Sequence, residues 1–227
     1  MSASFERAIA AIERRGILLV YPIANRPEPR SLWSELHPRS PMRWAWDAHA
    51  DGRVARLWRL REELARSDDV VYAKWFRGRA TFFARPVFRG ILASLARETA
   101  DARRGLSRQA RELLELLEDN SPQSTKELRA NAGLQGRVNE GVYTRALKEL
   151  WSRLLVVGVG EVDDGAFPSL AMSATRLHLE DLWPGSADAV ANAAADARRL
   201  AKVLAGAPLF ARELAKTLAV VQASHLT

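Results

Sequence analysis

The chain has 227 residues, of which 48% are apolar and 27% charged, a balance typical of a soluble globular protein. Cysteine is absent, which excludes disulfides, thiolate zinc sites and a cysteine nucleophile. The net charge of +7 comes entirely from residues 1–104, which hold 20 Lys and Arg against 12 Asp and Glu, whereas residues 105–227 hold 14 against 15. A basic first half predicts a polyanionic partner.

The four histidines are scattered and none pairs at i, i+4, so we expect neither a metal site nor a cofactor. The N-terminus lacks the basic-then-apolar pattern of a signal peptide. The longest apolar run, Ile17 to Tyr21, is far too short to cross a bilayer. We therefore expect a cytoplasmic protein without membrane contact.

The chain begins with an amphipathic pattern over 3–15 that predicts a helix ending at Gly16. Residues 17–21 are apolar and predict a short buried strand. Five prolines follow within residues 22–41, which predict an irregular segment with a short helix over 31–36.

A basic helix is predicted over 52–66, with Asp51 as its cap. Its expected apolar stripe consists of Val54, Leu57, Trp58, Leu64 and Ala65. Its opposite side carries arginines that would follow the major groove of DNA or its rim. These arginines are Arg53, Arg56 and Arg59.

Residues 70–84 predict a hairpin with a two-residue turn at Arg77-Gly78. In this register Tyr72 pairs with Phe83, and Lys74 pairs with Thr81. One face would then mix cations with aromatics: Tyr72, Lys74, Phe76, Arg79, Thr81 and Phe83. Such a face suits phosphates and bases, with Lys74, Arg77 and Arg79 as phosphate ligands. The alternative is an ordinary hairpin whose aromatics cover a neighbouring helix.

The second half predicts a winged helix, because three helices precede two strands within about 70 residues. The helices are expected over 107–119, from Thr125 to Gly133, and over 138–153. Ser124 and Glu127 fit a capping box that starts the second helix. The expected core stripe of the third is Val142, Ala146, Leu147, Leu150, Trp151 and Leu154. The strands are expected over 155–162 and 167–172.

The third of these helices would expose Arg137, Arg145 and Lys148 toward bases or phosphates. The turn between the strands is acidic, however, and contains Glu161, Asp163 and Asp164. Phosphates repel carboxylates, so this wing is expected to pack on a partner or on the rest of the chain, and the basic first half to lead DNA contact.

The last segment predicts two helices, over 187–204 and 209–221, separated by Gly206 and Pro208. The stripe of the first is expected at Val190, Ala194, Ala197, Leu200, Ala201 and Leu204. Such a helical hairpin packs on its own domain or forms a homodimer arm. No catalytic motif is recognised, since Gly158-Val159-Gly160 leads into a turn and not into a helix.

Two stretches, KWFRGRATFF (74–83) and GEVDDGAFPSL (160–170), lie in an order of elements that resembles the AlkZ/YcaQ type of winged-helix DNA glycosylase. That resemblance implies tandem winged helices and a concave DNA surface. The family's catalytic signature is Gln, one residue, Gln, whereas Gln109, Gln123, Gln135 and Gln222 are never two apart. The resemblance thus implies a related DNA-binding protein that is non-catalytic or acts differently.

Together these patterns predict a mainly α fold with small β-hairpins, built of tandem winged-helix-like modules and a C-terminal helical hairpin. The expected divisions are 1–104, 105–175 and 176–227. The expected function is binding of double-stranded DNA. Base excision with a displaced carboxylate, Asp47 or Glu180, is one alternative, and a transcriptional regulator or protein–protein scaffold is another.

Overall fold

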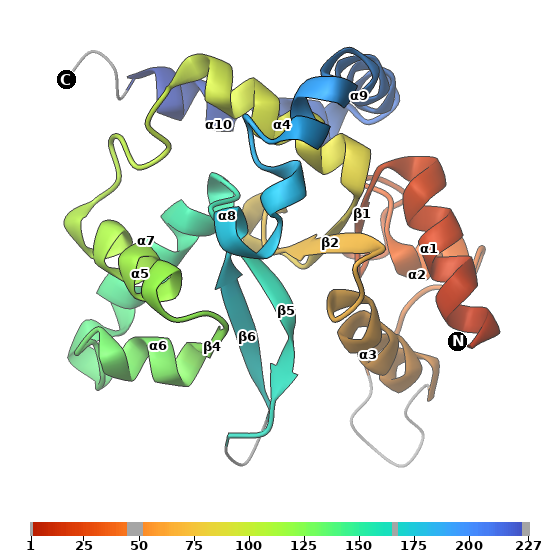
Figure 1. Ribbon diagram of the computed structural model, residues 1–227. Helices are drawn as coiled ribbons and strands as arrows, with labels where there is room; N and C mark the ends of the chain where they lie inside the picture. Colours follow the sequence, from red (N-terminus) through yellow and green to blue (C-terminus); the bar gives the residue numbers. More distant parts are fainter. Residues whose placement is uncertain (1, 45–51, 165–167, 224–227) are drawn as a thin grey trace.

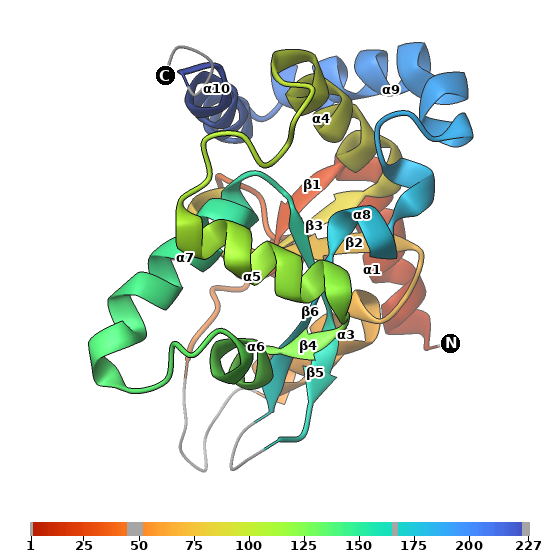
Figure 2. The ribbon, with the colours of Figure 1, turned by 60° about the vertical axis from the view of Figure 1, so that its left-hand side comes forward.

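The computed structural model describes residues 2–44, 52–164 and 168–223. It is mainly helical, around one antiparallel six-stranded sheet of order β1-β3-β2-β5-β6-β4. This confirms the predicted mainly α fold with small β elements. In the described residues, no helix is both long and apolar enough to span a bilayer. Helices α4 (Arg85–Glu98), α9 (Ala187–Ala205) and α10 (Pro208–Ala223) lie together at one end of the molecule (Figures 1 and 2).

The first predicted helices are confirmed. Ser2 caps the first helix by accepting a hydrogen bond from Phe5 N, and Gly16 ends it with φ of 79°. The predicted cap Asp51 lies outside the described residues. The first four elements are α1 (Ala3–Arg15), β1 (Ile17–Leu19), α2 (Leu32–Leu36) and α3 (Gly52–Ala65).

The predicted hairpin forms, but the predicted register and the predicted two-residue turn are wrong. Strands β2 (Val70–Ala73) and β3 (Thr81–Ala84) pair Tyr72 with Phe82 and Ala73 with Thr81. A longer loop containing the 3-10 turn η1 (Phe76–Gly78) replaces the tight turn. A two-residue turn would expose either Trp75 or Phe76 on one face, whereas the longer loop buries both.

The mixed face of cations and aromatics therefore does not exist. Tyr72, Phe76 and Phe83 are all buried, because both faces of β2 and β3 are covered. A strand that is buried on both faces loses the alternation from which an exposed face is predicted.

Helix α4 (Arg85–Glu98) has no counterpart among the predicted elements. Pro86 stands in its first turn, where a missing N–H costs nothing. Its apolar side chains fall on one side at helical spacing and are buried: Val87, Phe88, Ile91, Leu92 and Leu95. Helix α9 packs closely on it, since a Cβ on Gly90 would lie 3.1 Å from the carbonyl oxygen of Asp196.

The predicted order of elements in the second half is found. The capping box at Ser124 and Glu127 is present and starts α6. In α7 the predicted core residue Val142 is 36% exposed, and Tyr143 is buried instead, donating a hydrogen bond to the Thr125 carbonyl over 2.8 Å. Phe167, the expected start of the second strand, lies outside the described residues. The elements are α5 (Arg108–Asp119), β4 (Gln123–Ser124), α6 (Thr125–Asn131), η2 (Arg137–Asn139), α7 (Glu140–Ser152), β5 (Val156–Val162) and β6 (Ser169–Ala174).

The predicted C-terminal helices are confirmed, and Leu200 of the first is buried as expected, but the predicted stripe fails at Val190. Val190 is 68% exposed, and Asp196 is buried in an ion pair with Arg89 of α4. A buried carboxylate that needs a partner fixes the rotation of the helix more strongly than one valine does. The last elements are α8 (Thr175–His178), η3 (Glu180–Leu182), α9 (Ala187–Ala205) and α10 (Pro208–Ala223).

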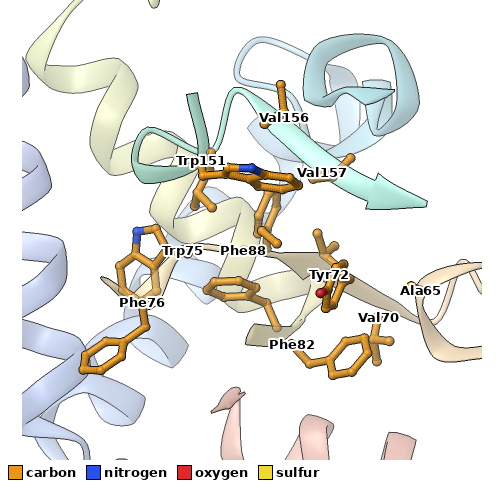
Figure 3. Packing of buried hydrophobic residues seen from close by; sticks show 14 of the residues in the cluster. Ala65, Val70, Tyr72, Trp75, Phe76, Phe82, Phe88, Trp151, Val156 and Val157 are labelled. Atoms are coloured by element: carbon orange, nitrogen blue, oxygen red, sulfur yellow. The ribbon is translucent and has the colours of Figure 1, made fainter. Parts of the chain in front are cut away.

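Strands of both halves share one sheet, because Tyr72 of β2 pairs with Gly158 of β5. A Cβ at position 158 would lie 2.4 Å from the Tyr72 ring. Gly160 has φ of +114° and faces the side chain of Arg66. The Gly158-Val159-Gly160 sequence thus serves close packing. Figure 3 shows Tyr72 and Phe82 of the first half in one cluster with Trp151 and Val157 of the second.

Candidate nucleic-acid interface

A cleft of about 200 Å³ opens between the loop 74–80, helix α7 and helix α10. We call it the cationic cleft, because six Lys and Arg line it against two Glu. Its lining residues are Lys74, Trp75, Arg77, Gly78, Arg145, Lys148, Glu149, Ser152, Arg153, Glu213, Lys216, Thr217 and Val220.

Helix α10 holds the loop that forms one wall of the cationic cleft. Arg77 adopts the left-handed region with φ of 51°, which a non-glycine residue maintains only when its surroundings enforce it. Its backbone N–H donates a hydrogen bond to Glu213 over 3.2 Å. Phe76 packs edge-on against Phe210, with ring centroids 5.3 Å apart. The loop is therefore fixed with the Arg77 side chain exposed.

The cations of the cleft differ in what surrounds them. Arg145, Lys148 and Lys216 are exposed, and none has an ion pair within the described part of the chain. Arg153 is buried and donates hydrogen bonds to the carbonyls of Arg104 and Gly105. Desolvation lowers the pKa of Arg153, and Glu149 opposes this shift. Three exposed, unpaired cations remain available to an anion.

Lys74 lies half-buried at the cleft. Desolvation by burial lowers the pKa of its ammonium group, and the nearby Arg61 guanidinium lowers it further, with Glu161 acting in the opposite direction. No carboxylate among the described residues lies within ion-pair distance of Lys74.

Four of the predicted nucleic-acid ligands come together here from both halves of the chain: Lys74, Arg77, Arg145 and Lys148. Arg79 and Arg137 are exposed but do not line the cleft. Lys216 and Arg153 were not among the predicted ligands. Lys216 follows an amphipathic helical pattern as an ordinary solvent-facing charge, so no local signal marks it.

The predicted arginines of α3 form a separate cluster. Arg53, Arg56 and Arg59 line a cleft of about 250 Å³ together with Arg7 of α1, and this cleft shares no lining residue with the cationic cleft. Arg53 donates a hydrogen bond to Ser40 Oγ over 2.9 Å and lies over the Trp33 ring. Arg53 is therefore partly engaged within the protein.

A buried ion pair joins α3 to β5 and corrects two predictions. Arg61 of α3 and Glu161 of β5 are 7% and 9% exposed and bind each other. Glu161 is therefore not part of an exposed acidic wing. Trp58, predicted in the core stripe, is 41% exposed, and Arg61 lies 4.4 Å from its ring centroid. Because the pair is buried, α3 is rotated about its axis so that Arg61 faces the core and Trp58 of the predicted apolar stripe faces solvent.

Asp164 of the acidic turn lies beside helix α6. Asp164 accepts a hydrogen bond from Ser124 Oγ over 2.7 Å, and its carbonyl accepts one from Lys126. Hydrogen bonds from Ser169 and Ser124 hold the pKa of Asp164 below its ordinary value. The ends of β5 and β6 near this turn point away from α10 (Figure 1). The acidic turn and the cationic cleft thus lie at different ends of the second half.

The carboxylates considered for base excision do not line the cationic cleft. Glu180 is exposed in the turn η3, and Asp47 lies outside the described residues. His, Asp and Glu side chains form no group of three suited to a metal ion within the described ranges.

A family model described as AlkZ related matches residues 2–198, which is most of the chain. No curated protein and no solved structure matches the chain significantly.

Proposed function

This chain belongs to the AlkZ-related family, and we propose that it binds duplex DNA through the cationic cleft. The observation that carries this proposal is the meeting of Lys74 and Arg77 from the first half with Arg145 and Lys148 from the second. Cations that are distant in sequence and meet without an ion pair to any described carboxylate favour a bound polyanion over a solvated surface.

Phosphates fit this arrangement in both charge and position. Arg145, Lys148 and Lys216 present exposed donors from two helices, and the loop between them is held by Glu213 and Phe210. Donors that are fixed before binding lose less conformational entropy on contact. We therefore assign the contact with the phosphate backbone of DNA to the cationic cleft, and not to the basic module of residues 1–104 alone.

We further propose that the segment from α5 to β6 acts as a winged helix, because its order of helices and strands is that of the motif. Residues that line the cleft belong to the C-terminal half of α7, Arg145 to Ser152. The recognition helix would thus contribute phosphate contacts near its end, with Arg137 in the turn η2 just before it. Arg53, Arg56 and Arg59 remain proposed contacts at a second place on the duplex.

Fluorescence anisotropy with a labelled duplex over a series of salt concentrations tests the proposal. Each phosphate contact contributes about 0.9 to the slope of log affinity against log salt. Replacement of Arg145 and Lys148 together by alanine should weaken binding and reduce the slope by nearly two such contacts. Arg176→Ala is the matched control, since Arg176 is an exposed arginine outside the cleft. Equal slopes for the double variant and the control would refute the proposed interface.

Family membership favours a second candidate function, excision of a damaged base, because the AlkZ/YcaQ type consists of DNA glycosylases. The Gln-x-Gln signature is absent, so a carboxylate such as Glu180 would have to activate water. Formation of abasic sites on alkylated or crosslinked duplexes tests this candidate. Activity that Glu180→Gln leaves unchanged would refute the assignment of that residue.

Self-association through α9 and α10 stays a proposal. Val190 is exposed on α9, and a second copy would cover it. Light scattering of the wild type and of Val190→Glu tests this point, and a monomeric wild type would contradict it.

A further inference from the structure

Lys74 is the cation of the cleft that phosphate binding explains least well. A phosphate ligand is best placed as an exposed charge, as Lys148 and Lys216 are. Lys74 instead stands half-buried just after β2, in the wall of the cleft, and no carboxylate of the described residues lies within ion-pair distance of its ammonium group. Lysine is rarely buried without a partner, because an unpaired buried ammonium group is costly.

The neighbourhood shifts the protonation equilibrium of Lys74 toward the neutral amine. Burial and the Arg61 guanidinium both lower the pKa of Lys74. Lys74 also lines the cleft in which the exposed cations Arg77, Arg145 and Lys148 lie. A neutral lysine amine in a partly desolvated site is a nucleophile toward carbonyl carbons.

We propose that Lys74 forms a reversible imine with the aldehyde of an abasic site in DNA bound at the cationic cleft. The ring-opened deoxyribose of an abasic site is an aldehyde flanked by two phosphates. The cleft offers the Lys74 amine to the aldehyde and exposed cations to the phosphates. This inference rests on the proposed DNA binding and adds a ligand class and a covalent step to it.

The step balances without an external oxidant or reductant. The Nζ lone pair attacks the C1′ aldehyde carbon, and the carbonyl oxygen takes a proton, which gives a carbinolamine. Loss of one water molecule then gives the imine between Nζ and C1′. Hydrolysis of the imine returns the amine and the aldehyde.

Borohydride trapping on the full chain tests the proposal. A duplex with one abasic site is mixed with the protein, and the reductant converts any imine to a stable secondary amine. The crosslinked species is then measured on a denaturing gel. Wild type should give an adduct whose yield rises with pH as Lys74 loses its proton. A duplex with a tetrahydrofuran residue, which has no aldehyde, should give none.

Two variants distinguish the reaction of the Lys74 amine from the effect of its positive charge on DNA binding. Lys74→Arg keeps the cation but removes the amine, and should reduce the adduct at least tenfold while tetrahydrofuran duplex is still bound. Lys202→Arg makes the same change at an exposed lysine outside the cationic cleft and should retain the adduct. An adduct that persists in Lys74→Arg would overturn the assignment.

The failure of this proposal is distinguishable from that of DNA binding. If the wild type binds the tetrahydrofuran duplex but gives no adduct with the abasic duplex, the role of Lys74 is refuted and DNA binding stands. If neither duplex is bound and no adduct forms, both are refuted.

Discussion

The buried pair of Arg61 and Glu161 predicts a large loss of stability when one partner is removed. Their exposures of 7% and 9% leave little solvent to screen the charges. Glu161→Ala would leave a buried guanidinium whose Nε already lacks a hydrogen-bond partner. Removal of one partner of a buried pair costs about 3–5 kcal/mol, so we expect the free energy of unfolding to fall by roughly that amount.

The same helix provides a matched control. Arg66 and Glu62 form an ion pair at the surface, with side chains 57% and 32% exposed. Exposed pairs of this kind contribute about 0–1 kcal/mol, so Glu62→Ala should change stability little. Urea denaturation, followed by circular dichroism with a common slope, measures both variants.

A double variant separates the charge from the space it fills. Arg61→Met with Glu161→Leu removes both charges and keeps apolar volume, and such replacements are often neutral or stabilising. We expect the double variant to be within about 1 kcal/mol of the wild type. The explanation is refuted if Glu161→Ala costs no more than Glu62→Ala, or if the double variant is as unstable as Glu161→Ala.

Four further changes in stability are expected from local geometry. Gly158→Ala should cost about 1–3 kcal/mol, because its Cβ would overlap the Tyr72 ring. In Gly141→Ala the new Cβ meets nothing within 4 Å, so this variant should raise the free energy of unfolding by about 0.5 kcal/mol. Equal changes in the free energy of unfolding for Gly158→Ala and Gly141→Ala would contradict both predictions. Tyr143→Phe loses the hydrogen bond to the Thr125 carbonyl and should cost about 1 kcal/mol, whereas an unchanged midpoint would argue against that bond. Burial opposes ionisation of Glu35, but hydrogen bonds from Arg14 and Arg15 outweigh it and hold its pKa below the ordinary 4.5. The stability from ionised Glu35 is thus present above about pH 4.5 and is lost as the pH falls through the folded-state pKa. Glu35→Gln should therefore show a shallower acid loss than the wild type, and parallel curves would contradict it.

Helices were predictable where local chemistry specifies them. Ser124 and Glu127 form the expected capping box, and Gly16 ends α1 as its backbone freedom allows. The predictions failed where a partner distant in the sequence determines which side of a helix is buried. Arg61 displaces Trp58 from the core because Glu161 lies across from it, 100 residues later in the chain. No periodicity within α3 contains that information.

The candidate site was predictable residue by residue but not as an assembly. Lys74, Arg77, Arg145 and Lys148 were all expected to meet DNA, yet on two separate modules. Their meeting depends on α10, whose Phe210 and Glu213 hold the loop at Phe76 and Arg77. Those contacts cross more than 130 residues of sequence, which is beyond what turn chemistry at Arg77-Gly78 can specify.

The pairing of β2 with β5 has a consequence for how the chain can be divided. A fragment ending near residue 104 would carry β2 with one side unpaired, and its complement would carry β5 in the same state. Unpaired strand edges recruit other chains. We expect each fragment alone to aggregate, and co-expression of the two to restore a soluble complex. The boundary that charge and sequence order indicate thus runs through one continuous sheet.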